Sequence, residues 1–157
     1  MAQKTAWNAA ALTEADINLY LAGEGGAWRV WTPTVTQSGA VAATVNRATF
    51  GRWGRMIVAT GFLTVTGTGT SNNAVLISGL PAAAAYATGI VGTSALSDVS
   101  DTRTYVGVVA LASTTTFNIL GSPPGANTAL GATGSPFVAA LTSPDQISFT
   151  ITYEAAS

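Results

Sequence analysis

The chain has 157 residues, only 8% of them charged, and it contains neither histidine nor cysteine. This composition excludes histidine-based catalysis, thiol nucleophiles, Cys/His zinc sites and disulfides within the chain. A formal net charge of −1 also argues against a protein whose main task is to neutralise phosphates. The length suits one domain with a hydrophobic core, and the scarcity of charge leads us to expect a homo-oligomer that buries uncharged surface between its subunits.

Apolar residues make up 48% of the chain, but they do not form membrane spans. Gly, Thr, Ser, Asn or Pro interrupts every apolar run well short of the ~18 residues that cross a bilayer. The N-terminus reaches Glu14 and Asp16 without a continuous apolar stretch, so we expect no secretory signal. We therefore expect synthesis in the cytoplasm and no membrane insertion.

The first predicted element is a short helix that begins after Thr13. Thr13 suits the N-cap, and Glu14 and Asp16 fall in the first turn, where carboxylates favour the helix dipole. Gly23 stands where a left-handed C-cap is expected. A helix of ~10 residues is not stable alone, so it packs either on its own domain or on another protein. We predict that residues 1–26 are an attachment segment, whose apolar contacts come from Leu12, Ile17, Tyr20 and Leu21.

After Gly23, Gly25 and Gly26 the pattern turns to β-strands and stays so over residues 27–157. Alternating apolar residues make Gln146–Glu154 the clearest strand. Frequent β-branched residues and turn signals predict an all-β domain, an antiparallel, jelly-roll-like β-sandwich of about eight strands. The other predicted strands are Trp28–Gln37, Val41–Phe50, Arg55–Thr66, Ala74–Ser78, Ala87–Ala95, Thr104–Ala112 and Thr115–Leu120.

Three segments between these strands predict turns or loops. Gly51–Gly54 indicates a tight hairpin, Gly67–Asn73 a polar loop, and Gly121–Pro136 a long loop rich in Gly, Pro, Ser and Asn. Loops on a rigid β scaffold are frequent recognition sites, so we expect the two longer loops to face outward. The candidate surface-recognition residues are Arg52, Trp53, Arg55, Asn72, Asn73 and Asn127.

The hairpin also offers a nucleic-acid alternative. Arg47, Arg52 and Arg55 are interleaved with Phe50 and Trp53, and such mixtures can bind single strands by charge and stacking. Arginines around a hairpin more often lie in solvent at its edge, however, and the chain has no net positive charge to attract a nucleic acid. We therefore expect no nucleic-acid partner.

Carboxylates suggest two further alternatives. Asp98 and Asp101 could bind calcium, but that ion takes roughly six to eight oxygen ligands and no third acidic residue is near in sequence. A turn with two solvated acids is the favoured interpretation. Paired carboxylates could also hydrolyse glycosides, yet none of them stands in a recognisable motif. We expect no catalytic residue, no metal and no cofactor.

Aromatic side chains are the last candidates, because their faces can stack on sugar rings. Packing in the core or between subunits is the more frequent role of such residues. The aromatic residues considered are Trp28, Trp31, Trp53, Tyr86 and Tyr105.

Several short stretches, in their order and spacing, carry a resemblance over nearly the whole chain. They are Trp31–Gln37, Thr44–Phe50, Gly54–Val58, Val65–Thr70, Gly79–Pro81, Phe137–Leu141 and Ile151–Ala156. Together they resemble a domain common in virion proteins of tailed bacteriophages that infect actinobacteria, and Leu12–Tyr20 looks like the helical segment that often precedes it. The resemblance implies a trimer-forming β-sandwich on the virion exterior, of the minor tail protein or fibre-head kind, without cofactor or catalytic residues.

Three functions compete at this point. The first is a tail-tip or fibre-head module that touches the bacterial envelope through its glycans, the second is a capsid decoration protein, and the third is a carbohydrate-active enzyme. The third is disfavoured because no carboxylate of the chain stands in a recognisable motif. We expect the first, with capsid decoration as the alternative. The expected partners are other copies of the chain, other virion proteins of the tail or capsid, and a host cell-surface glycan, and the expected location is the virion.

Overall fold

The computed structural model describes residues 28–122 and 140–156. The predicted helix, the attachment segment 1–26, Asn127 and most of the loop Gly121–Pro136 lie outside these ranges. All regular structure in the described residues is antiparallel β, which confirms the predicted all-β class. The strands are β1 Arg29–Val30, β2 Thr34–Thr36, β3 Ala40–Val41, β4 Ala43–Trp53, β5 Met56–Val65, β6 Val75–Ser78, β7 Gly89–Asp98, β8 Arg103–Leu111, β9 Thr116–Ser122 and β10 Gln146–Glu154.

Alternation of side chains decides which side of each strand faces the core. In β10 every second residue from Ile147 to Tyr153 is buried, and the residues between them are exposed or half-buried. In β5 the same period of two runs from Ile57 to Val65. The predicted strand Gln146–Glu154 is therefore confirmed at both ends.

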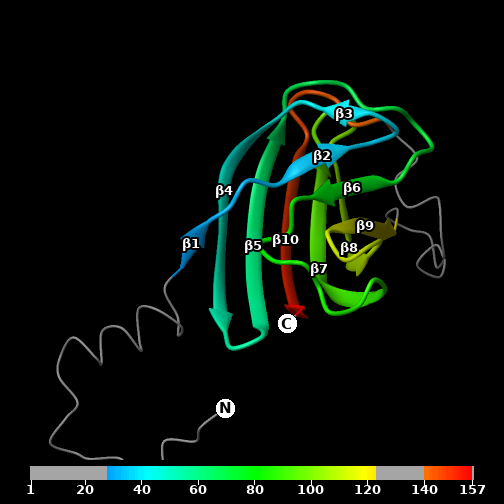
Figure 1. The fold of residues 1–157 in the computed structure, drawn as a ribbon. Helices are drawn as coiled ribbons and strands as arrows, with labels where there is room; N and C mark the ends of the chain where they lie inside the picture. Colours follow the sequence, from blue (N-terminus) through cyan, green and yellow to red (C-terminus); the bar gives the residue numbers. More distant parts are fainter. Residues whose placement is uncertain (1–27, 123–139, 157) are drawn as a thin grey trace, which may run out of the picture.

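The ten strands form one sheet in the order β1-β4-β5-β10-β7-β8-β9-β6-β2-β3, and this sheet curls into a half-barrel (Figure 1). Five long strands, β4, β5, β10, β7 and β8, stand side by side, and the short strands β6, β2 and β3 cross in front of them in this view. The core lies between the two arms of the curl.

The single strand predicted over Trp28–Gln37 is wrong. β1 pairs with β4 near one end of the sheet order, whereas β2 pairs with β6 near the other. Pro33 lies between them, is buried and has no N–H to donate to a ladder, so the strand breaks there. The predicted hairpin also shifts: β4 continues to Trp53, and the turn consists of Gly54 and Arg55, with Gly54 at a φ of 58°.

One residue, Ala42, connects β3, at one end of the sheet order, to β4, which lies next to the other end. β3 ends at Val41 and β4 begins at Ala43, and the Ala42 carbonyl accepts hydrogen bonds from the N–H groups of Thr66 (2.8 Å) and Gly67 (3.0 Å). The chain therefore passes from one arm of the half-barrel to the other at Ala42, a corner of the kind at which strands change sheets.

A row of mostly small residues crosses the core-facing side of the long strands. Its members, placed side by side by the strand register, are Ala48, Gly61, Phe149, Ser94 and Gly107. The ring of Phe149 lies over Gly61, where an added Cβ would be 2.2 Å from Phe149 Cζ. Phe117 and Trp31 meet this ring edge-on, with centroids 5.0 and 6.1 Å away. Gly61 therefore leaves room for the ring.

Buried polar groups connect the loops at the end of the half-barrel that follows β5. Gln37 is 1% exposed, and its Oε1 accepts a hydrogen bond from the Leu141 N–H (2.8 Å). Its Nε2 donates to the Asn73 carbonyl (3.3 Å), and the Gly69 N–H donates to the Leu141 carbonyl (2.8 Å). The predicted loop Gly67–Asn73 lies here between β5 and β6, and Gln37 ties it to the residues before β10.

Candidate functional site on the outer face

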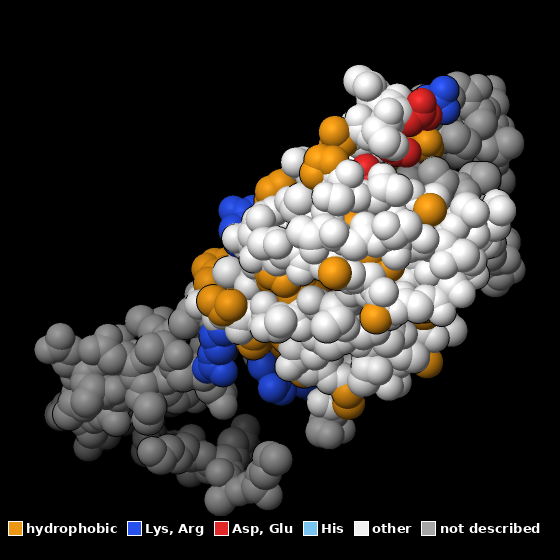
Figure 2. All heavy atoms as spheres, turned by 90° about the horizontal axis from the view of Figure 1, so that it is seen from above, with side chains coloured by type: hydrophobic (Ala, Val, Ile, Leu, Met, Phe, Trp, Pro, Cys, Tyr) orange, Lys and Arg blue, Asp and Glu red, His pale blue; other side chains and the backbone are white. Residues whose placement is uncertain are grey.

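The five long strands present one side to the core, and we call the opposite side the outer face. Hydroxyl-bearing and apolar side chains dominate its centre. Figure 2 shows charged side chains near the margins of one view of the molecule and uncharged ones over most of the rest. The central residues of the outer face are Thr60, Phe62, Thr93, Ala95, Val106, Ser148 and Thr150. A rigid sheet of this kind offers fixed hydrogen-bond donors and acceptors to a ligand.

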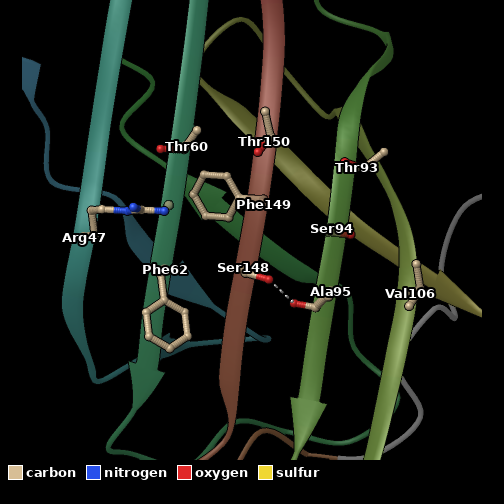
Figure 3. A pocket seen from close by; sticks show the side chains of 11 residues that line it. Arg47, Thr60, Phe62, Thr93, Ser94, Ala95, Val106, Ser148, Phe149 and Thr150 are labelled. Carbon is tan, nitrogen blue, oxygen red and sulfur yellow. Dashed lines mark hydrogen bonds between the residues drawn. The ribbon is translucent and has the colours of Figure 1, made fainter. Parts of the chain in front are cut away.

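A shallow groove of about 480 Å³ crosses the outer face from β4 to β8 (Figure 3). Arg47 lines it at one side and Val106, which is 70% exposed, at the other. Gly61, Ser94 and Phe149 also line the groove, but they occupy core-facing positions, so the backbone of the sheet forms its floor. Among the described residues that line the groove, Arg47 alone is charged.

A β-bulge aims Arg47 at the groove. The register shifts between Val45 and Arg47, and the extra residue Asn46 donates a hydrogen bond to Thr64 Oγ1 at 2.7 Å. Arg47 then stands opposite Phe62, and its side chain extends from β4 toward β5 (Figure 3). Neither ion pair found in the described part of the chain involves Arg47.

Trp53 packs over Gly51 on the outer face at the far end of β4. Trp53 and Gly51 are two residues apart and share this face, and three indole atoms lie 2.8–3.6 Å from the point where a Cβ of Gly51 would be. Gly51 thus makes room for the ring, which remains 40% exposed. Met56, 47% exposed, stands opposite Trp53 on β5.

Two further apolar residues extend this surface at the sheet edge. Continuing the register of β1 against β4 brings Trp28 beside Gly51, and Val30 pairs with Thr49. Trp28 is 55% exposed and Val30 82% exposed. Exposed apolar clusters rimmed by polar residues mark binding surfaces. We call this cluster the aromatic corner, and it consists of Trp28, Val30, Trp53 and Met56.

Two threonines lie between Arg47 and the aromatic corner. The hydroxyl groups of Thr49 and Thr60 are 3.3 Å apart and share a hydrogen bond across β4 and β5. Along β4, six residue steps separate Arg47 from Trp53, which is about 20 Å at ~3.3 Å per residue. A ligand that contacted both residues would lie along this strand.

The structure separates the recognition residues predicted from the sequence. Arg52, Trp53 and Arg55 lie together at the β4–β5 turn, whereas Asn72 and Asn73 lie at the opposite end of β5. The Asn73 amide donates to the carbonyls of its own loop at Thr70 (3.4 Å) and Ser71 (3.0 Å). These residues therefore do not form one site.

The arginines at the turn are engaged with the backbone. Arg52 Nε donates to the Gly54 carbonyl (2.7 Å) and Arg55 Nε to the Ala155 carbonyl (3.1 Å). Arg55 also pairs with Glu154 at 3.2 Å. On β4, Phe50 and Arg52 stand opposite core-facing residues, away from the face that carries Arg47 and Trp53. The interleaved arginines and aromatics therefore do not share one platform.

The prediction that Asp98 and Asp101 are both solvated is wrong for Asp98. Asp98 is 3% exposed and accepts hydrogen bonds from Ser100 Oγ (2.7 Å) and the Asp101 N–H (3.0 Å). Its carboxylate is buried because it closes the β7–β8 turn, and β7 extends to this residue. Asp101 is exposed and pairs with Arg103 at 3.1 Å. No group of three His, Cys, Asp or Glu side chains in the described residues is arranged to hold a metal ion.

Asp145 is a second buried carboxylate, at 0% exposure. Its two oxygens accept hydrogen bonds from the N–H groups of Val99 (3.0 Å) and Thr142 (2.8 Å). It therefore fastens the β7–β8 turn to the segment that enters β10. Both buried acids are used by the backbone of turns.

Tyr153 fixes the segment between β6 and β7 from the core side. Its hydroxyl donates to the Ala82 carbonyl (2.9 Å) and accepts from the Ala82 N–H (3.3 Å). Burial raises the pKa of the Tyr153 phenol above its ordinary value, against the smaller opposing effects of the bond to Ala82 and the charge of Arg52.

Trp53 was predicted from the sequence as a recognition residue, but its packing on Gly51 was not predicted. The i, i+2 spacing of Gly51 and Trp53 was a usable signal, because such residues share a face in a strand. The pairing of Phe62 with Arg47 depends on the bulge and had no sequence signal. Of the other aromatic candidates, Trp31 is buried in the core, whereas Trp28 and Tyr86 are exposed.

The sequence and structure were compared with those of known proteins. The described residues contain no helix that could cross a membrane. No family model, curated protein or solved structure matches this chain.

Proposed function

We propose that this chain is a non-enzymatic structural module on the exterior of a bacteriophage virion, at the tail tip or fibre head, that contacts glycans of the host cell surface. The aromatic corner carries this proposal. Two exposed indoles beside rows of hydroxyl groups form a surface on which sugar rings can stack and hydrogen-bond. The resemblance of the sequence to virion domains of tailed phages supplies the biological context.

The geometry of Trp53 favours this role because the ring is held before any ligand arrives. The indole packs on Gly51, and Thr49 and Thr60 are joined by their own hydrogen bond. Groups ordered in the free protein lose little conformational entropy on binding, so more of the contact energy is expressed as affinity.

The carboxylates support the non-enzymatic part of the proposal. Asp98 and Asp145 are buried and accept backbone hydrogen bonds within turns. Glu154 and Asp101 are engaged in exposed ion pairs. None of these acids lines the groove on the outer face.

Assembly belongs to the same proposal. The chain acts as a homotrimer, and residues 1–26 attach it to other virion proteins. In this arrangement the half-barrel is an opened form of the jelly-roll-like sandwich, with β6, β2 and β3 as the second layer. The protein needs no cofactor, nucleic acid or membrane insertion for this role.

Immunogold electron microscopy of phage particles tests the location, with an antibody raised against this chain. We expect label at the tail end. Label spread over the head would instead support capsid decoration, and particles without label would refute the virion assignment.

Cell binding tests the contact itself. Fluorescently labelled full-length protein should bind actinobacterial cells, and Trp53→Ala should lower the bound signal several-fold. Tyr86→Ala is the matched control, because this tyrosine is equally exposed but lies between β6 and β7. Equal loss of binding in both variants, or no binding by the unaltered protein, would refute contact through the aromatic corner.

A further inference from the structure

The outer face of β4 carries an aromatic surface at one end and an isolated positive charge at the other. Trp53 packs over Gly51 at the first end, and Arg47 stands beside Phe62 at the second. The hydroxyl pair of Thr49 and Thr60 lies between them. We call this strip, from the aromatic corner to Arg47, the β4 lane.

The charge of Arg47 gives the lane a chemical preference. A guanidinium binds a carboxylate or phosphate through two parallel hydrogen bonds, and such charge-assisted bonds are roughly twice as strong as neutral ones. The other described residues that line the groove are uncharged, so nothing in the lining competes for Arg47.

The length of the lane sets the size of the ligand. About 20 Å separate the two ends, by the rise of an extended strand. A single sugar cannot reach both Trp53 and Arg47, whereas a short oligosaccharide can.

We propose that the β4 lane binds an anionic oligosaccharide, with one sugar ring stacked on Trp53 and an acidic group of the same chain, carboxylate or phosphate, paired with Arg47. This inference rests on the proposed contact with cell-surface glycans and names the class of glycan. The hydroxyls of Thr49 and Thr60 face the sugars between the two anchor points.

A second copy of this chain is a less suitable occupant of the lane. Two copies that met through the same face would bury both Arg47 side chains. The described lining of the groove offers them no carboxylate, and the carboxylate of Glu154, opposite Met56, is already paired with Arg55 at 3.2 Å. A buried charge without a partner is strongly unfavourable. An anionic glycan neutralises that charge and leaves its remaining polar groups in water.

Titration of the full-length protein with defined oligosaccharides tests the proposal, with tryptophan fluorescence and calorimetry as readouts. The probes are an oligogalacturonate for the carboxylate, a glycerol-phosphate oligomer for the phosphate, and a cello-oligosaccharide of similar length as the neutral reference. We expect at least one anionic probe to bind roughly ten-fold more tightly than the neutral one, with affinity that falls as salt rises. The preferred anionic probe identifies the acidic group.

Two variants separate the ends of the lane. Arg47→Gln should lower the affinity for the anionic probe about ten-fold, to that of the neutral probe, and should leave neutral binding unchanged. Trp53→Ala should weaken both. Arg103→Gln is the matched control, since it removes one positive charge at the start of β8, outside the lane, and should change neither affinity. Unfolding midpoints of all variants establish that they remain folded.

Three results would overturn the inference. Equal affinity for anionic and neutral probes, or an Arg47→Gln protein that binds like the unaltered one, removes the role of the charge. Cell binding by a protein that binds none of the probes rejects the anionic glycan while the proposed function stands, whereas absence of cell binding rejects the proposed function itself. Dissociation of the oligomer by Arg47→Gln or Trp53→Ala in sedimentation equilibrium would assign the lane to contact between copies.

Discussion

Gly61→Ala should destabilise the protein, because the added methyl group meets the ring of Phe149. The new Cβ would lie 2.2 Å from Phe149 Cζ, so the ring would have to retreat by about 1.2 Å to reach the 3.4 Å of ordinary contact. Phe117 and Trp31 border that ring within the core. Overpacking of this kind costs about 1–3 kcal/mol. Without the contact, replacing a strand glycine by alanine would stabilise the fold by roughly 0.5–1 kcal/mol, so the sign of the effect is diagnostic.

Urea unfolding of four variants measures this effect. Gly39→Ala is the matched control, because no atom lies within 4 Å of its added Cβ, and its stability should equal or slightly exceed that of the unaltered protein. Phe149→Leu alone should cost about 1–2 kcal/mol through lost packing. The double variant Gly61→Ala/Phe149→Leu should lose at least ~1 kcal/mol less unfolding free energy than the two single variants lose in sum. A Gly61→Ala protein as stable as the original, or strictly additive effects, would refute the proposed clash.

Two further predictions concern buried hydrogen bonds. Tyr153→Phe should lose about 1–2 kcal/mol at neutral pH, through the two bonds to Ala82. The pKa of Tyr153 is raised in the folded state, so the stabilisation by its phenol is present below about pH 10 and is lost as the pH rises through the folded-state pKa. Tyr153→Phe should therefore lose less stability than the unaltered protein between about pH 9 and pH 12. Identical pH profiles of the two proteins would contradict this prediction. Asp145→Asn should cost about 2–3 kcal/mol, because an NH₂ group then faces the N–H of Val99 or Thr142. Urea denaturation measures this loss, and an unfolding free energy equal to that of the unaltered protein would contradict the prediction.

Local patterns predicted the strands better than their arrangement. The alternation in Gln146–Glu154 identifies a strand because each side chain reports its own environment. It carries no record of the partners of that strand, which come from residues 56–64 and 92–97. The order of the ten strands in the half-barrel therefore could not be predicted from the alternation of side chains. The break at Pro33 could have been predicted from its missing N–H, but the β-branched threonines on both sides of it favoured a continuous strand.

The candidate site was predictable only in part, for the same reason. Trp53 was identified because it stands among the arginines of the predicted hairpin, where basic and aromatic residues are interleaved. Arg47 was grouped with the turn arginines, since sequence distance cannot represent the bulge that turns it toward Phe62. Asp98 was expected in water because the turn that it closes became evident only with its hydrogen bonds to Ser100 and Asp101.

The place of β10 has a consequence for biosynthesis. This strand follows all the others in the sequence, yet it lies between β5 and β7 (Figure 1). Until it leaves the ribosome, the edges of β5 and β7 that it covers are unpaired, and open edges of this length invite aggregation. Pairing between residues so distant in sequence is also intrinsically slow. A chain interrupted before residue 146 therefore lacks the strand that joins the two halves of the sheet, and we expect it to aggregate rather than to fold with reduced stability.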